Sequence, residues 1–447
     1  MGVRYSVHRS VFYLLWMGSV AGICQVSLPQ AQSALNVPAA ADEPAVASAE
    51  ISAQLAEAEA AIVKSDWKTA EAKLAAWLAA HPSDARALFD AGYVADAENR
   101  LEDAAGFYRR AVEVNPKSFE AHVELGLLLA RQGRPEDARL ELAAATALDA
   151  GAAGAEAKAR AWRALAQIDG KDDPGAASTD LIEALKLSPE TNADTVLAGS
   201  LAERAGQLDA ADAAYRRLLA KDANSAQANA GLAHILIVRK KYPEAETLLR
   251  TALDKTPDEL VLNVQLAAVL DAEDKAEALP LLRKLHVSHP DNATITRMLA
   301  VVLAEAGDAD ASDKLCVMLL AANPEDAELL IAHGQNLLRQ PNFPEAFKAF
   351  DKATQLDESN ADGWSGLALA ASKTNQPMFT LHALTMRSRY LPELPSTYYL
   401  WATAYDALHD YARAITYYHH FLDASSGKMP NQELQAKQRL MVLGGKR

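Results

Sequence analysis

A small residue returns along this chain at a spacing of 34 residues. Ala70, Ala104 and Ala138 are each 34 apart, and Ala177 resumes the series after an insertion. A larger side chain stands four positions after each small one. The full series is Ala70, Ala104, Ala138, Ala177, Ala211, Ala245, Ala278, Ser312, Ala346, Thr380 and Ala414. A period of this length predicts a stack of similar units, because one such unit is too short to bury a core alone.

Each period contains two runs of apolar residues at three- and four-residue spacing, separated by a polar turn such as 131–137. This spacing is typical of amphipathic helices, so each period predicts a helical hairpin. Small residues where two helices cross allow close contact. A second small column lies twelve residues before the first, at Ala58, Gly92, Gly126, Gly199, Ala233, Ala300, Gly334, Ala368 and Ala402. Prolines close the periods at Pro82, Pro116, Pro189, Pro257, Pro290, Pro324 and Pro392.

The period, the two small columns and the proline resemble the tetratricopeptide repeat, most clearly in PSTYYLWATAYDALHDYARAITYYHHFLDASS at 395–426. The resemblance covers residues 51–428. It implies an all-α, right-handed superhelical solenoid of about eleven hairpins. Residues 429–447 are expected to form a capping helix and tail, with Leu434, Leu440 and Met441 facing inward.

Three departures from the pattern predict local irregularity. The fourth repeat follows an insertion at 149–157 and has Leu165 at its expected small position. The seventh lacks one residue between its helices, so that Ala267 takes the small position after a one-residue shift. In the tenth, Arg387 replaces the usual late alanine.

The resemblance also implies that the first helix of each repeat lines a concave groove. Its second, fifth, ninth, twelfth and thirteenth residues would point into that groove. The Lys and Asn pair with which some relatives clamp a carboxylate is absent. The residues predicted to bind a partner in the groove are Phe89, Tyr93, Leu127, Trp162, His234, Ile331, Gln335 and Tyr399. The alternative is that several of them only contact the neighbouring helix.

Four acidic groove residues, Asp96, Glu203, Asp271 and Asp406, favour a basic protein or peptide partner. The formal net charge of −15 argues against nucleic acid as a partner. Seven of the thirteen tyrosines fall between Tyr390 and Tyr418. We interpret this aromatic group as core packing, and a docking surface is the alternative.

The amino terminus has the layout of an export signal, in which a basic start precedes an apolar stretch shorter than a membrane span. We assign residues 1–33 to this signal and 34–50 to a flexible leader rich in Ala and Pro. Ile23 immediately before Cys24 is unlike a lipoprotein signal. The chain is therefore expected to be exported, to the periplasm or beyond, without an integral membrane span.

No pattern of catalytic, cofactor-binding or metal-ligating residues stands out. Neighbours such as His419 and His420 diverge on a helix, and Cys316 falls at a core position. The sequence thus predicts a non-enzymatic scaffold or adaptor, without cofactors, in a bacterial envelope or secretion assembly. The alternative is an accessory subunit of an envelope enzyme complex, for example in polysaccharide or outer-membrane biogenesis.

Overall fold

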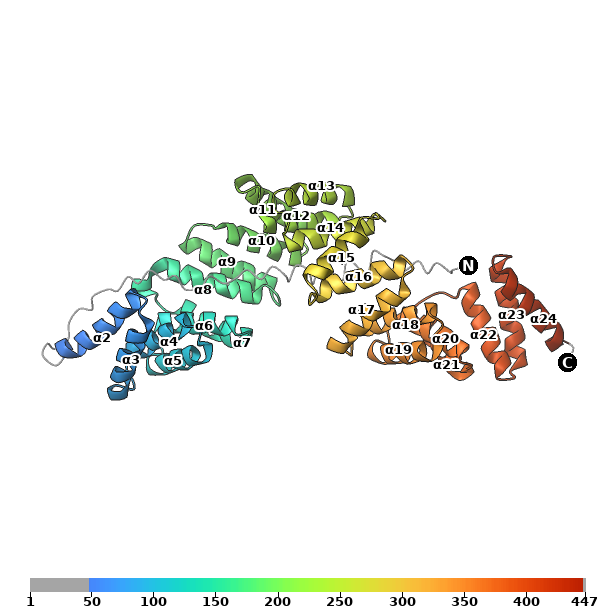
Figure 1. Ribbon diagram of the computed structural model, residues 1–447, viewed down its shortest axis with the longest axis horizontal. Coiled ribbons are helices and arrows are strands. Elements are labelled where there is room, and N and C mark those ends of the chain that lie inside the picture. The colour runs from blue at the N-terminus through green and yellow to red at the C-terminus, as the bar shows by residue number, and fades with distance from the viewer. Residues whose placement is uncertain (1–47, 445–447) are drawn as a thin grey trace. The chain divides into compact units, whose positions relative to one another are not determined.

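The computed structural model describes residues 48–444, and these form 23 α-helices and one 3-10 helix with no strand (Figure 1). The predicted signal, and the leader up to residue 47, lie outside the described residues. The chain divides into two compact units, the first ending at Leu262 and the second beginning at Asn263.

The helices follow one another in pairs from α2 to α23, and α24 comes after the last pair. The first unit contains α2 (Ser48–Val63), α3 (Trp67–Ala80), α4 (Ala85–Ala97), α5 (Leu101–Val114), α6 (Phe119–Arg131), α7 (Pro135–Ala147), the 3-10 helix η2 (Gly151–Ala153), α8 (Gly154–Asp169), α9 (Pro174–Leu187), α10 (Asn192–Arg204), α11 (Leu208–Lys221), α12 (Ala226–Val238) and α13 (Tyr242–Leu253). The boundary between the units falls within α14 (Leu260–Ala272). The second unit continues with α15 (Ala278–Ser288), α16 (Ala293–Glu305), α17 (Ala309–Ala322), α18 (Ala327–Arg339), α19 (Phe343–Leu356), α20 (Ala361–Lys373), α21 (Pro377–Arg387), α22 (Pro395–Ala407), α23 (Tyr411–Ser425) and α24 (Pro430–Gly444).

Within each unit the hairpins stack as a solenoid. In the first unit α4 contacts α5, α5 contacts α6, and α6 contacts α7; in the second, α18 to α23 continue in the same way. We call the even-numbered helices the first helices and the odd-numbered ones the second helices. The predicted all-α solenoid of hairpins is confirmed.

The proline column precedes the start of each next first helix. Asp84, Ser118, Asn292 and Asp326 each stand two residues after a proline of the column, and each caps a first helix by accepting backbone N–H groups with its side chain. Such capping satisfies amide donors that the first turn leaves without partners. The motif therefore ends one hairpin and begins the next.

Glycines in the first helices allow the second helices to insert bulky rings between them. The ring of Tyr215 lies between Gly199, in the small column of its own repeat, and Gly231, two positions before the column in the next repeat, where a Cβ would approach ring carbons to 2.5 and 2.3 Å. Phe350 lies between Gly334 and Gly366 in the same manner, with approaches of 2.8 and 2.2 Å. A side chain larger than hydrogen would overlap the ring at these positions.

The fourth repeat has a different register from the predicted one. Leu165 does not occupy the small position, because it clusters with residues of the third repeat such as Phe119 and Leu142. Ala166 takes that position, since it is fully buried and clusters with Ala177 and Leu181 of α9. The turn between α8 and α9 lacks the left-handed residue that most other repeats have there, and Ala166 stands 11 residues before Ala177, whereas the two small positions of most other repeats are 12 apart. By contrast, Ala267 is fully buried in the seventh repeat, as the predicted shift requires.

The rotation of α24 also differs from the prediction. Leu434 and Met441 are 58% and 72% exposed, and only Leu440 of the three expected residues packs against the core of the second unit. Ala436 and Leu443 are buried instead. Two polar contacts favour this rotation, because Glu433 accepts the amide N–H groups of 427 and 429 while the α24 arginine at 439 reaches α22.

The aromatic group near the carboxy terminus is packed internally. Trp401, Tyr405 and Tyr417 stack on one another between α22 and α23, with centroids 5.3 to 5.9 Å apart. Arg387, which replaces an alanine, is buried and donates to the hydroxyl of Ser365 and the carbonyl of Pro392. The aromatic stack thus stabilises the last hairpin, and Arg387 stabilises the one before it.

Replacing Gly92 with Ala is expected to destabilise the protein by about 1 to 3 kcal/mol, because a Cβ there would lie 2.6 Å from the ring of Tyr108. The measurement is urea unfolding followed by circular dichroism. Gly106→Ala in α5 of the same hairpin is the control, since nothing lies within 4 Å of its added Cβ. Better helix propensity should stabilise that control by up to about 1 kcal/mol. Equal effects of the two substitutions would contradict the close-packing argument.

Candidate binding groove

Side-chain bridges between acidic and basic groups connect neighbouring first helices from α2 to α12 of the first unit; four are Arg–carboxylate pairs and one is a His–Glu contact. One such bridge, here called a rung, occurs at each step from α2 to α12. The rungs are Glu59–Arg86, Asp96–Arg131, Glu124–Arg160, Arg163–Asp194 and Glu203–His234. Their partners are 27 to 36 residues apart in sequence, about one period. The rungs therefore add polar links to the apolar packing of successive repeats.

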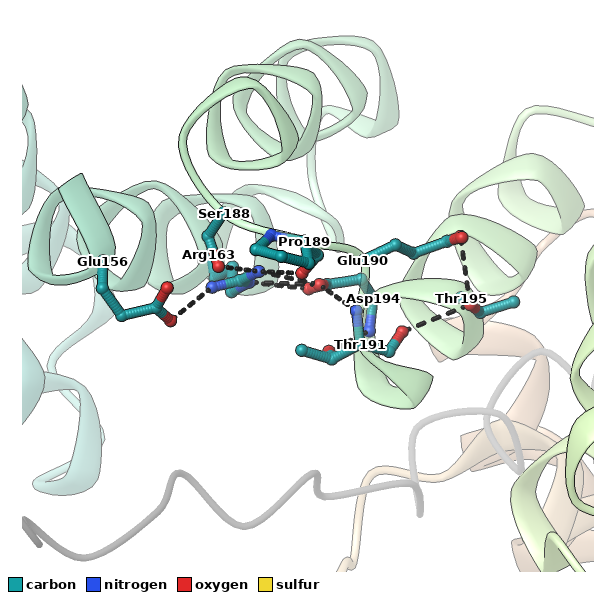
Figure 2. A network of polar contacts seen from close by, with 8 residues as sticks. All are labelled: Glu156, Arg163, Ser188, Pro189, Glu190, Thr191, Asp194 and Thr195. Atoms are coloured by element: carbon teal, nitrogen blue, oxygen red, sulfur yellow. Dashed lines mark hydrogen bonds and ion pairs between the residues drawn. The ribbon is translucent and has the colours of Figure 1, made fainter.

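The rung between α8 and α10 is the most highly connected (Figure 2). Arg163 Nε lies 2.9 Å from Asp194 Oδ1, and Nη2 lies 3.0 Å from Oδ2. The same Nη2 donates to Ser188 Oγ at 3.3 Å and to the carbonyl of Pro189 at 3.1 Å. Asp194 in turn forms a capping box with Thr191 at the start of α10. Arg163 thus holds α8, the loop before α10 and α10 itself together, directly after the irregular fourth repeat.

The second unit also contains rungs. Arg297 Nη2 lies 2.5 Å from Asp326, which caps α18. Arg439 of α24 binds both carboxylate oxygens of Asp406 of α22, at 2.5 and 2.8 Å. Arg339 Nη1 donates to the backbone carbonyl of Ala304 at 3.0 Å instead of to a carboxylate.

The predicted groove residues lie on first helices, and most are half-buried. Several of them make contacts within the chain. Phe89 packs 5.6 Å from the ring of Tyr108, and Tyr399 donates a 2.7 Å hydrogen bond to Gln435 of α24. Tyr93 lies 6.3 Å from the ring of Trp67, measured between centroids. These side chains therefore stabilise the stack as well as lining the surface.

The remaining predicted residues differ more from one another. Leu127 and Trp162 both pack against the core cluster of the third and fourth repeats. Because of the register shift in α8, Arg163 and not Trp162 stands at the fifth position. His234 belongs to a rung, with Nδ1 2.5 Å from Glu203. Ile331 is buried, whereas Gln335 is half-buried and keeps an accessible surface.

The acidic groove residues do not form an open negative surface. The carboxylates of Asp96, Glu203 and Asp406 are only 9%, 12% and 10% exposed, and each is in a rung. Asp271 is buried. The structure therefore removes the observation on which a basic partner was predicted.

Sequence reasoning missed the rungs, although a signal for them exists. Acidic and basic residues such as Asp96 and Arg131 are one period apart and near the ends of first helices. Because the bridges span separations of 27 to 36 residues, the signal is opposite charges on successive first helices and not one fixed spacing.

Burial raises the pKa of two carboxyl groups, one beside a rung and one within a rung. Burial raises the pKa of Asp90 to about 7, and the charge of nearby Glu59 adds to the rise. Burial also raises the pKa of Glu124, against the opposing effect of Arg160. Asp90 Oδ2 makes no hydrogen bond with the described residues. A buried carboxylate oxygen without a hydrogen-bond partner destabilises the native state when the group is charged.

The described residues contain few side chains arranged for nucleophilic or metal chemistry. Burial raises the pKa of the Cys316 thiol to about 11, so the thiolate nucleophile is disfavoured. Within residues 48–444, no group of three or more metal-ligating side chains comes together.

None of the helices within residues 48–444 is long and apolar enough to cross a bilayer.

The stacked hairpins and their first-helix surface define a helical repeat solenoid. The chain belongs to the tetratricopeptide repeat family. Models of this repeat match residues 55–114, 108–155, 202–267 and 268–327, about half of the chain.

Two curated relatives come from bacteria. The chain is 30% identical over 277 residues to cellulose synthase operon protein C of Xanthomonas axonopodis pv. citri, which covers 59% of this chain and 18% of that protein. It is 25% identical over 285 residues to cellulose synthase 1 operon protein C of Komagataeibacter xylinus, covering 56% and 21%. The match spans about a fifth of the length of these relatives. Among solved structures, Pseudomonas aeruginosa pilF is similar at 19% identity and a TM-score of 0.42, covering 47% of this chain and 96% of that one.

Replacing Arg163 with Met is expected to cost about 3 to 5 kcal/mol of unfolding free energy, because it leaves the 3% exposed carboxylate of Asp194 without its partner. Urea unfolding of the purified chain measures the effect. Arg216→Met is the control, since that arginine is 60% exposed in its pair with Asp212 and should cost less than about 1 kcal/mol. A small loss for Arg163→Met would show that the network in Figure 2 contributes little.

Asp90 should make the native state less stable as the pH rises. Its pKa is higher in the folded than in the unfolded chain, so its favourable contribution is complete below about pH 4 and is lost as pH rises through about 7. The slope is about 1.4 kcal/mol per pH unit where the two states differ by one proton. Unfolding free energies at pH 5 and pH 8 test this, with Asp90→Asn as the comparison. We expect the wild type to lose stability relative to Asp90→Asn over that range; parallel curves would contradict the assignment.

Proposed function

We propose that this chain is a non-catalytic scaffold that binds a partner protein along its first helices. The observation that carries the proposal is that hairpin repeats account for nearly all of residues 48–444, leaving no separate segment of catalytic size among them. Tetratricopeptide solenoids present extended surfaces for binding other chains. The buried thiol and the dispersed histidines of the described residues are consistent with this role.

The half-buried side chains of the first helices are the proposed contact residues. Tyr93 and Leu127 combine an accessible surface with a position fixed by packing. Gln335 is also half-buried and offers a polar group. Rigid, partly apolar side chains of this kind bind at a low cost in conformational entropy. Phe89, Trp162 and Tyr399 would contribute through their exposed edges, and His234 would contribute together with its rung. Ile331 would act by supporting the surface from beneath.

The similarity to two cellulose synthase operon proteins favours a more specific second proposal. In it the chain is an accessory component of a bacterial polysaccharide-producing assembly at the cell envelope. The predicted export signal at 1–33 agrees with this location. The match covers only about a fifth of the length of these relatives, so the proposal extends to a shared binding role and not to a shared reaction.

The scaffold proposal predicts that Tyr93→Ala combined with Leu127→Ala weakens partner capture at least about tenfold, as expected when central contact residues are truncated. The measurement is a pull-down from cell-envelope extract with quantitative mass spectrometry. Leu140→Ala with Ile182→Ala is the control, because these residues are 70% and 54% exposed on second helices of the same unit.

Both variants must remain helical and monodisperse before the comparison is made. A partner lost only with the control variant would place binding on the second helices and contradict the proposed groove. Failure to capture any partner with the wild type would leave the scaffold proposal without support.

A further inference from the structure

One connection between hairpins differs from the others in the apolar character of its surface. It is the segment 388–394, which joins α21 to α22 and contains Tyr390, Leu391 and Leu394. These residues are 49%, 36% and 47% exposed. Within residues 48–444, the other segments that join a second helix to the next first helix contain no exposed large apolar residue. We call 389–394 the apolar loop.

The loop is long because the second helix before it is short. α21 has 11 residues, whereas α17 and α19 have 14. Seven residues therefore separate α21 from α22, where four separate α19 from α20. The small residues on either side keep their spacing of 34, so the residues that α21 lacks are found in the loop.

A buried network attaches the loop to the helices on either side. Arg387, at the end of α21, is 3% exposed. Its guanidinium donates to Ser365 Oγ of α20 at 3.1 Å and to the carbonyl of Pro392 at 2.9 Å. Glu393 lies 3.9 Å from Arg387 Nη1 and accepts from the indole N–H of Trp401 at 3.3 Å. The arginine that departs from the repeat pattern thus supports the loop from its buried side.

The amide groups of the loop have acceptors within the chain. The N–H groups of residues 388 and 389 donate to carbonyls of α21, and those of 390 and 391 both donate to the carbonyl of Arg387. The N–H of Leu394 donates to the hydroxyl of Thr397, and Pro392 has no N–H. Such a segment loses few hydrogen bonds when it leaves water for an apolar medium.

The exposed apolar area is small for a protein interface. With about 150 to 250 Å² for a large side chain, the exposed parts of the three apolar residues amount to about 200 to 330 Å². A stable interface between two proteins covers about 800 Å² on each partner. A lipid surface needs no complementary pocket, and the affinity for it grows with the apolar area that enters it. The loop is therefore better suited to lipid than to a protein surface.

We propose that the apolar loop inserts into the interfacial layer of a lipid bilayer and holds the scaffold reversibly against a membrane surface. Leu391 and Leu394 enter the outer part of the acyl chains, and Tyr390 lies at the level of the headgroups, where its ring and hydroxyl are both accommodated. The exposed Arg389 reaches the phosphates. The net charge of −15 repels anionic headgroups, so neutral lipid is the preferred surface. This contact is additional to the proposed binding of a partner protein and uses none of the groove residues.

The test places a fluorophore in the loop of the full chain. Cys24→Ser combined with Leu394→Cys gives an accessible thiol in the loop, because Cys316 is buried. The thiol is labelled with nitrobenzoxadiazole, whose emission shifts to the blue when it leaves water. The labelled chain is titrated with vesicles of phosphatidylcholine, and with vesicles in which a third of the lipid is anionic phosphatidylglycerol. Leu140→Cys, labelled in the same way, is the matched control, since Leu140 is 70% exposed on a second helix of the first unit.

We expect a blue shift, and quenching by spin-labelled lipid, for the label at Leu394→Cys but not for the label at Leu140→Cys. The shift should be larger with neutral vesicles and should persist at high ionic strength, because salt screens charges and not apolar contacts. The signal is local to the loop, so attachment of the chain through the predicted export signal at 1–33 does not imitate it. No shift in the loop, or an equal shift at both labels, would overturn the proposal.

The same label measures the affinity for vesicles. In the chain labelled at Leu394→Cys, Tyr390→Ser with Leu391→Ser should weaken binding to neutral vesicles at least about tenfold, because two of the three inserted side chains become polar. Leu140→Ser with Ile182→Ser should leave the affinity unchanged, since these residues are exposed on second helices of the first unit. Equal affinities of the two double variants would contradict insertion of the loop.

Two further outcomes separate the apolar loop from the scaffold function. Tyr93→Ala with Leu127→Ala should leave the response to vesicles intact even where it abolishes partner capture, and loss of that response would overturn the assignment to the loop. A label in the loop that responds to lipid-free envelope proteins but not to vesicles would show that the loop binds a protein, and the lipid proposal would fail while the scaffold function stood.

Discussion

The close approach of first helices to the bulky rings between them, made possible by glycines, is the constraint on which the remaining structure depends. Tyr215 and Phe350 each fill the space between two first helices, and they fit only because glycines face their rings. This contact sets how near successive first helices lie to one another. Charged side chains one period apart can then meet, as Arg163 and Asp194 do in Figure 2. The polar rungs are therefore a consequence of the apolar packing and not a substitute for it.

The hairpins could be predicted from sequence because their signals are local and repeated. Small residues, the bulky residue four positions later, and the capping residue after most of the prolines all point to the same unit. The prediction was wrong where local contacts differed from the repeat pattern. In the fourth repeat the two small positions are one residue closer in sequence, so Ala166 takes the place assigned to Leu165. In α24, the attachment of Arg439 to Asp406 and of Glu433 to backbone amides accompanies a rotation that exposes Leu434.

The candidate site was less predictable than the fold. The groove residues were predicted from the geometry of the repeat family. That geometry does not show whether a side chain already has a hydrogen-bond or packing partner within the chain. Tyr399 and His234 stand on first helices as predicted, and both have partners within the chain. The acids expected to attract a basic partner are paired and nearly buried. Which charges face outward depends on pairing across repeats, and that pairing requires the register to be known.

The rungs also restrict how such a chain can change by gain or loss of whole repeats. A stack of identical hairpins would tolerate unequal recombination at any boundary, because every junction would be equivalent. Here the end of α6 carries a cation that requires an acid near the end of α4, whereas α18 follows a helix that offers none. Moving one repeat beside another would bury a charge without its partner or place like charges together. The charged side chains therefore make each junction between repeats specific to its neighbours, although the small residues at which the helices pack recur in every repeat.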